Sequence, residues 1–150
     1  MRIVIQRVSS SSVLINGTLK RSIDRGLMVL LGIEMADTTA DVDWLVNKTL
    51  NIRIFDDDDG VMNRSVLDIE GELMVISQFT LMAATKKGNR PSYIRAAKHE
   101  HAIPLYEEFL EKTERQLGRK VICGKFGADM QVSLTNDGPV TLVIDSKNKE

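Results

Sequence analysis

The segment Ser77-Gln78-Phe79-Thr80 places two hydroxyls and an amide directly after the apolar run Leu73–Ile76. A buried strand that ends in such groups can project them into a cleft, and its last backbone N–H groups can bind a developing oxyanion. The same residues also suit an ordinary strand end, where serine and threonine side chains satisfy local backbone groups. We therefore take this segment as the first candidate for hydrolytic chemistry, with a purely structural role as the alternative.

A second candidate feature is the charge pattern around that segment. The whole chain has 20 Lys plus Arg against 21 Asp plus Glu, a net charge of −1, yet residues 73–99 contain no acid. The cations in this stretch are Lys86, Lys87, Arg90, Arg95 and Lys98. They form either a solvated surface or a rim that contacts phosphates. Near-neutral overall charge argues against non-specific coating of nucleic acid and favours a grip on one end of an RNA.

Side chains for metal or triad chemistry are scarce. His99 and His101 are the only histidines, and on a helix this spacing points them in different directions, as on a helix surface. The single cysteine, Cys123, allows no internal disulfide and favours a reducing cytoplasm. No zinc, nucleotide or dinucleotide motif is present, and the run Asp56–Asp59 lacks the spacing of a calcium loop. We expect no metal and no cofactor, so a hydrolase would rely on backbone donors and on groups of its substrate.

The dipeptide Gly138-Pro139 is the third candidate feature. Within Asn136-Asp137-Gly138-Pro139 it predicts a turn between two strands. An X-Pro bond is trans by default, with about one in twenty cis. Because glycine has no side chain and proline no N–H, this backbone can approach a ligand closely.

The elements that must position these groups follow from periodicity and turn signals. Asn16-Gly17 between apolar runs predicts a hairpin, and the apolar run 27–33 predicts a central strand covered on both faces. Helices are expected from about 38 to 50, from Ser92 to about Ala102, and from Pro104 to a stop at Gly118. Further strands are expected at 52–55, two within 65–81 around Glu70-Gly71, and at 121–123, 130–134 and 140–144. We predict an α+β fold in a single domain of residues 1–150, with mostly antiparallel, barrel-like sheets and about three packed helices.

The N-terminal apolar stretch is too short for a signal peptide, and no apolar run approaches the roughly 20 residues of a membrane span. We therefore expect a cytoplasmic protein with no membrane partner.

Four motifs in order identify a family. They are Ser77–Leu81, Lys87–Ser92, Phe126–Met130 and Asn136–Thr141, together with the start Met1-Arg2 through Arg7-Val8. Over nearly its whole length the chain resembles the D-aminoacyl-tRNA deacylases, also called D-tyrosyl-tRNA deacylases. Tyr93 stands where the family often has phenylalanine, which keeps the ring.

The resemblance implies an enzyme that hydrolyses the ester between a D-amino acid and tRNA, and that also clears glycine mischarged on alanine tRNA. It implies a homodimer in which Ser77, Gln78, Phe79 and Thr80 receive the 3′ aminoacyl-adenosine. Gln78 and the backbone N–H groups of Phe79 and Thr80 would support the oxyanion. Thr80 is either a nucleophile or a positioning residue; we favour positioning, because no residue is obviously placed to activate its hydroxyl.

In the same resemblance, a cis Gly138-Pro139 of the partner subunit excludes L side chains, and Arg7 holds that motif. Phe126 and Met130 line the adenine pocket. The charge pattern described above, and not the resemblance, predicts that Lys86, Lys87 and Arg90 contact the tRNA. Two alternatives remain open at this point: a non-catalytic module that binds RNA ends, and an esterase for small molecules.

Overall fold

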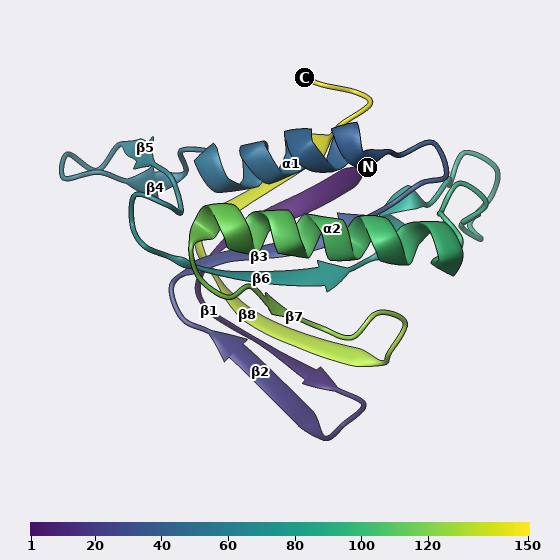
Figure 1. The fold of residues 1–150 in the computed structure, drawn as a ribbon, viewed down its shortest axis with the longest axis horizontal. Helices are drawn as coiled ribbons and strands as arrows, with labels where there is room; N and C mark the ends of the chain where they lie inside the picture. The colour runs from purple at the N-terminus through teal and green to yellow at the C-terminus, as the bar shows by residue number, and fades with distance from the viewer.

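Two parallel neighbours, β3 (Gly26–Gly32) and β6 (Glu72–Ser77), form the centre of a six-stranded sheet with both helices on one face (Figure 1). The computed structural model describes all 150 residues. The strand order is β2-β1-β3-β6-β7, and β8 pairs with the other edge of β1. The remaining strands are β1 (Arg2–Ile15), β2 (Leu19–Ile23), β7 (Ile122–Cys123), β8 (Met130–Asp145), and a separate pair, β4 (Phe55–Asp56) and β5 (Met62–Arg64). The helices are α1 (Thr39–Asn51) and α2 (His99–Leu117), with a 3₁₀ turn, η1, at Phe79–Met82.

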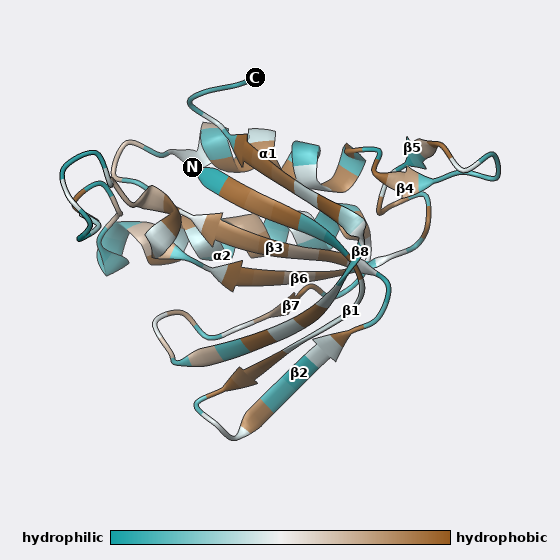
Figure 2. Ribbon diagram, turned by 180° about the vertical axis from the view of Figure 1, so that it is seen from behind, coloured by the Kyte–Doolittle hydropathy of each residue, from teal (hydrophilic) through white to brown (hydrophobic).

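The central strands are buried on both faces, as the apolar run 27–33 predicts. Leu27 and Val29 pack toward the core shared with the two helices, whereas Met28 packs in a second core with Val13 and Ile15 of β1. Figure 2 shows hydrophobic colour along β3 and β6 and more polar colour on β2. Burial of both faces fixes the position of β6, whose end carries the first candidate segment.

The sheet curls because β1 changes its partner midway. Residues 2–8 of β1 pair with β3 and residues 11–15 pair with β2, while β8 follows the opposite edge of β1 along both parts. Arg21 of β2 donates a hydrogen bond from its guanidinium to the carbonyl oxygen of Cys123 in β7 at 2.6 Å. This contact joins the two ends of the sheet path, so the prediction of barrel-like, mostly antiparallel sheets is confirmed, although β6 pairs in parallel with both β3 and β7.

The predicted hairpin at Asn16-Gly17 is also confirmed. Both residues have positive φ, 48° and 70°, as the central residues of a type I′ turn require. The turn joins β1 to β2 in antiparallel register.

The predicted helices from Ser92 and from Pro104 are wrong. Residues 92–98 are not helical, and one helix, α2, runs from His99 through Pro104 to Leu117. Ser92 instead pairs its backbone with Ala84 at 2.8 and 2.9 Å, which closes the loop between them. Proline removes one N–H near the start of α2, where burial of the face containing Ala102, Tyr106 and Phe109 stabilises the helix. The structure thus has two α-helices and one 3₁₀ turn, in place of about three helices.

Two strand predictions also need correction. Residues 65–70 form a turn, closed by the bond from the Gly71 N–H to the Val66 carbonyl at 2.9 Å. The segment 136–139 is no turn between strands, because β8 is one continuous strand through it. Both halves of β8 pair with the same strand, β1, and this long pairing overrides the local turn signal.

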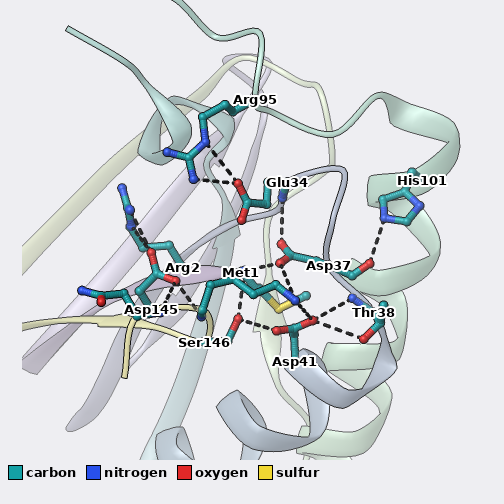
Figure 3. A network of polar contacts seen from close by, with 12 residues as sticks. Met1, Arg2, Glu34, Asp37, Thr38, Asp41, Arg95, His101, Asp145 and Ser146 are labelled. Atoms are coloured by element: carbon teal, nitrogen blue, oxygen red, sulfur yellow. Dashed lines mark hydrogen bonds and ion pairs between the residues drawn. The ribbon is translucent and has the colours of Figure 1, made fainter. Parts of the chain in front are cut away.

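A buried polar network joins the start of β1 to the end of β8 and to the loops that begin both helices (Figure 3). The α-amino group of Met1 pairs with the Asp37 carboxylate and donates to the hydroxyl oxygen of Ser146 at 3.0 Å. Ser146 in turn donates to Asp41 at 2.7 Å, and His101 donates to the carbonyl oxygen of Asp37 at 3.0 Å. His101 is therefore a half-buried structural contact of α2 and does not stand free on the helix surface.

Neither helix is long and apolar enough to cross a membrane.

Candidate active site

A cavity of about 810 Å³ opens where the end of β6, the start of α2 and the loop before β8 meet. Five of the residues predicted for the site line it: Ser77, Gln78, Phe79, Phe126 and Met130. The other lining residues are Leu31, Ile33, Ile76, Ala96, Ala97, Lys98, His99, Ala102, Gly127, Ala128, Asp129 and Val132. The volume lies in the range of small-molecule sites, and most of the wall is apolar.

The polar end of this cavity is built by the turn that follows β6. The Gln78 N–H donates to the carbonyl of Leu31 at 2.7 Å, which fixes the turn to the end of β3. Its first internal bond runs from the Leu81 N–H to the Gln78 carbonyl at 3.3 Å, so the N–H groups of Phe79 and Thr80 have no partner within the turn. Such free donors beside a cavity can bind a carbonyl oxygen.

Thr80 is a residue of that turn, but it does not line the cavity. The Gln78 side-chain amide donates to the Thr80 hydroxyl oxygen at 2.5 Å. This is the only side-chain hydrogen bond that the structure gives Thr80, and no titratable group bonds to it. No general base of this chain therefore contacts the Thr80 hydroxyl.

Gly32 allows the turn to lie this close to β3. A Cβ at Gly32 would stand 2.9 Å from both the Gln78 carbonyl oxygen and the Leu81 Cβ, closer than atoms pack. The position of the free N–H groups thus depends on a missing side chain in the neighbouring strand.

The apolar wall of the cavity centres on Phe126. Its ring makes edge contacts with His99 and Tyr106, at centroid distances of 5.5 and 5.7 Å. The buried Tyr106 hydroxyl donates to the Val75 carbonyl at 3.1 Å, and burial holds the pKa of this phenol well above its usual value. Two rings, one of them fixed by a hydrogen bond, therefore orient Phe126.

Met130 completes this wall through a close approach to the backbone. A Cβ at Gly124 would lie 2.3 Å from the Met130 sulfur, so a larger residue there would displace the thioether from its present position. A polarizable thioether at this point can adapt to a flat ligand.

His99 lines the cavity although its place in the sequence did not indicate this role. The expected helix from Ser92 would have had His99 in its interior, whereas α2 begins at His99 and directs that end toward the cavity. Asp129 also lines the cavity and was not singled out from the sequence, whereas Lys98 was expected only as part of a basic rim. The usable signal was the position of Pro104, which is compatible with a helix that begins one turn earlier.

Gly138 and Pro139 lie outside the cavity. They belong to a bulge of β8: one residue separates Gln6 from Val8 in β1, whereas four separate their partners Thr141 and Asn136. Gly138 lies eight residues beyond Met130 in β8, up to about 25 Å along an extended strand. Both residues of the Gly138-Pro139 pair are exposed, and the peptide bond between them is cis.

The Arg7 side chain binds this bulge through hydrogen bonds to backbone carbonyl oxygens. Its guanidinium donates to the carbonyl oxygens of Asp137 at 3.0 Å and Ile54 at 2.7 Å, and lies 3.3 Å from the Asp56 carboxylate. The Asn136 side chain closes the base, since its oxygen accepts from the Val140 N–H at 3.0 Å and its amide donates to Thr141 at 2.8 Å. Asp56, at the start of the aspartate run, is thus part of the support.

The basic loop, Lys86, Lys87 and Arg90, lies in the segment closed by the Ala84–Ser92 backbone pair. All three side chains are exposed and none forms an ion pair or lines the cavity. Arg95 differs, because it pairs with Glu34 at 2.7 Å. Within residues 73–99, the cations without an ion pair are therefore those of the basic loop and Lys98. No group of three or more His, Cys, Asp or Glu side chains is arranged to hold a metal ion.

A family model described as D-Tyr-tRNA(Tyr) deacylase matches residues 4–145. The chain belongs to this family. Relatives named D-aminoacyl-tRNA deacylase share 61% identity in Bacteroides fragilis YCH46 and 57% in Flavobacterium johnsoniae, each over all 150 residues and the full length of the relative. The family expected from the sequence motifs is therefore confirmed, and with it the expectation of an enzyme.

Solved structures agree on the fold. The c-Myc DNA Unwinding Element Binding Protein is 40% identical with a TM-score of 0.91, covering 97% of this chain and 98% of that one. A probable eukaryotic D-amino acid tRNA deacylase is 18% identical with a TM-score of 0.83, covering 95% and 97%; at that identity the similarity concerns the fold alone.

Proposed function

We propose that this protein hydrolyses the ester bond between a D-amino acid and the 3′ end of tRNA, in the cytoplasm and without a cofactor. The observation that carries the proposal is the meeting of the Ser77–Thr80 turn with the Phe126 and Met130 wall in one cavity. The family relationship supports the same substrate class.

The terminal adenosine belongs against the apolar wall. Phe126 offers a ring whose orientation is set by two aromatic neighbours, and Met130 offers an adaptable thioether. Aromatic faces stack on bases without requiring a particular sequence. This placement leaves the ester at the polar end of the cavity.

At that end the Phe79 and Thr80 N–H groups, with the Gln78 amide close by, receive the carbonyl oxygen. Water adds to the carbonyl carbon, negative charge develops on the oxygen, and these donors stabilise it. The C–O bond to the ribose then breaks, releasing the amino acid and the tRNA hydroxyl. Since the only side-chain partner of Thr80 is Gln78, water or the neighbouring ribose hydroxyl handles the proton and Thr80 positions the turn.

Chirality is read by backbone in this proposal. Because the bulge with Gly138 and Pro139 lies outside the cavity of its own chain, a homodimer would bring the partner subunit's Gly138 and Pro139 over the Ser77–Thr80 turn. Their backbone leaves no room for an L side chain, yet admits any D side chain and glycine. One site can then serve many D-amino acids and also clear glycine from alanine tRNA.

The deciding experiment follows ester loss from D-Tyr-tRNA and L-Tyr-tRNA. We expect rapid loss of the D ester and negligible loss of the L ester. Equal rates would refute the chiral gate, tRNA binding without turnover would support an RNA-end-binding module, and hydrolysis of small esters without need of tRNA would support an esterase.

The Thr80→Ala variant tests the proton step. Activity within about tenfold of the parent supports positioning, because removal of a covalent nucleophile costs far more. A loss of several thousandfold in kcat would assign the nucleophile to Thr80 instead.

A further inference from the structure

The rings of Phe79 and Tyr93 lie together at the edge of the cavity. The mechanism proposed above uses the backbone N–H of Phe79 but neither ring. Phe79 is 57% exposed and Tyr93 39% exposed, and their ring centroids are 5.2 Å apart in an edge contact. Phe79 lines the cavity, whereas Tyr93 does not. The pair therefore continues the cavity wall outward onto the surface.

This exposure is unusual within the chain, which has only four Phe, two Tyr and one Trp. Phe55, Phe109 and Tyr106 are buried, and Phe126 lies in the cavity wall. Two rings left open together at the mouth of a cavity indicate a ligand with a flat apolar face.

The segment that carries Tyr93 is held on both sides. Before it, Ser92 and Ala84 exchange backbone hydrogen bonds of 2.8 and 2.9 Å. After it, the Ala97 N–H donates to the Ile33 carbonyl at 2.9 Å, and Arg95 pairs with Glu34 (Figure 3). A ring on such a segment is already in place before a ligand arrives, which lowers the entropy cost of binding.

Charge next to the pair selects the class of ligand. The basic loop begins two residues after the Ala84 contact, and its cations have no acidic partners. Residues 73–99 contain no acid at all. Stacking rings beside unpaired cations are the combination that binds single-stranded nucleic acid.

We propose that the Tyr93 ring stacks on the base of the nucleotide that precedes the terminal adenosine, with the Phe79 ring, set at 71° to it, against the edge of that base, while the basic loop contacts its phosphate. The inference rests on the proposed function, since it needs the terminal adenosine in the cavity. The aromatic pair then guides the single-stranded end of the tRNA out of the cavity toward the basic loop.

The experiment compares two substrates: D-Tyr-tRNA and 3′-O-D-tyrosyl-adenosine, which ends at the terminal nucleoside. Tyr93→Ala should lower the ratio of kcat/KM for the tRNA over the adenosine ester by about tenfold, the size of one lost base stack, mainly through KM. Tyr93→Phe should restore the ratio, because it keeps the ring. Ile94→Ala is the matched control, since Ile94 is 87% exposed and adjacent in sequence, and it should not change the ratio.

An equal loss on both substrates would overturn the proposal, because it would assign Tyr93 to the shape of the cavity. An unchanged ratio would also overturn it, as would a shift of Tyr93→Ala from dimer to monomer in sedimentation, which would assign the pair to contact with a second copy. If the parent protein hydrolyses neither substrate, the proposed function fails; fluorescence anisotropy with a CCA trinucleotide then tests the stacking site, which predicts about tenfold weaker binding by Tyr93→Ala.

Discussion

Gly32→Ala should impair catalysis even under conditions in which the protein remains folded. The added Cβ would lie 2.9 Å from the Gln78 carbonyl oxygen and the Leu81 Cβ, and ordinary contact begins at 3.4 Å. The turn must therefore move by about 0.5 Å. Since a misplacement of about 1 Å costs on the order of 100-fold in rate, we expect kcat/KM for D-Tyr-tRNA to fall about tenfold. Overpacking of this size costs about 1–3 kcal/mol of unfolding free energy.

Gly71→Ala is the matched control for that variant. Its Cβ would meet the Ile69 Cδ1 at 2.9 Å and the Val66 Cγ2 at 3.0 Å, so the crowding is similar but falls on side-chain ends that can rotate. Steady-state deacylation at a temperature well below both unfolding transitions separates the effects. Parent activity in Gly32→Ala, or the same loss in Gly71→Ala, would refute the argument that the glycine at the end of β3 places the free N–H groups.

Three further predictions concern other parts of the molecule. Arg7→Gln leaves two carbonyl oxygens without their donor, so the unfolding free energy should fall by about 1–3 kcal/mol. The rate of L-Tyr-tRNA hydrolysis should also rise. An unchanged ratio of D to L hydrolysis would show that Arg7 does not control the conformation of the bulge. Burial alone would raise the pKa of Asp41, but hydrogen bonds from Lys147 and Ser146 outweigh it and hold this pKa well below its usual range. A carboxyl with a lowered folded pKa stabilises above its unfolded pKa of about 3.9 and loses this contribution as pH falls toward the folded value. Asp41→Asn should therefore unfold more easily at pH 7, and the difference from the parent should shrink in acid titration monitored by circular dichroism. Replacing the three cations of the basic loop by glutamine should flatten the dependence of log kcat/KM on log salt by up to about 2 units of slope; an unchanged slope would exclude this loop from phosphate contact.

The sequence predicted correctly those elements for which the hydrophobic pattern, the turn residues and the packing in the fold all favour the same structure. The run 27–33 is apolar at each position, so it could only be a covered strand, and Asn16-Gly17 suits the positive φ of a tight hairpin. The candidate segment at 77–80 followed from the end of such a run, and three of its residues, Ser77, Gln78 and Phe79, line the cavity, whereas Thr80 does not.

The missed features depend on contacts between distant parts of the chain. Ser92 has the chemistry of a helix cap, but its backbone pairs with Ala84, and this moved the helix start to His99. Asp137-Gly138-Pro139 has the chemistry of a turn, but pairing with β1 on both sides keeps β8 continuous. The contact of Arg7 with Asp137 joins residues 130 apart in sequence, and no local pattern encodes it.

The bulge of β8 can change without disturbing its surroundings. Its base is closed by Asn136, and regular pairing with β1 continues from Gln6–Thr141 on one side and, after a second register shift, from Ser10–Thr135 on the other. Asp137 is bonded to Arg7 and Val140 packs against the core, so the exposed Gly138 and Pro139 are the residues that can change while the strands on either side, and Met130 at the cavity, stay where they are. Substitutions at this exposed tip can therefore change what the segment contacts, while the cavity and the core keep their structure.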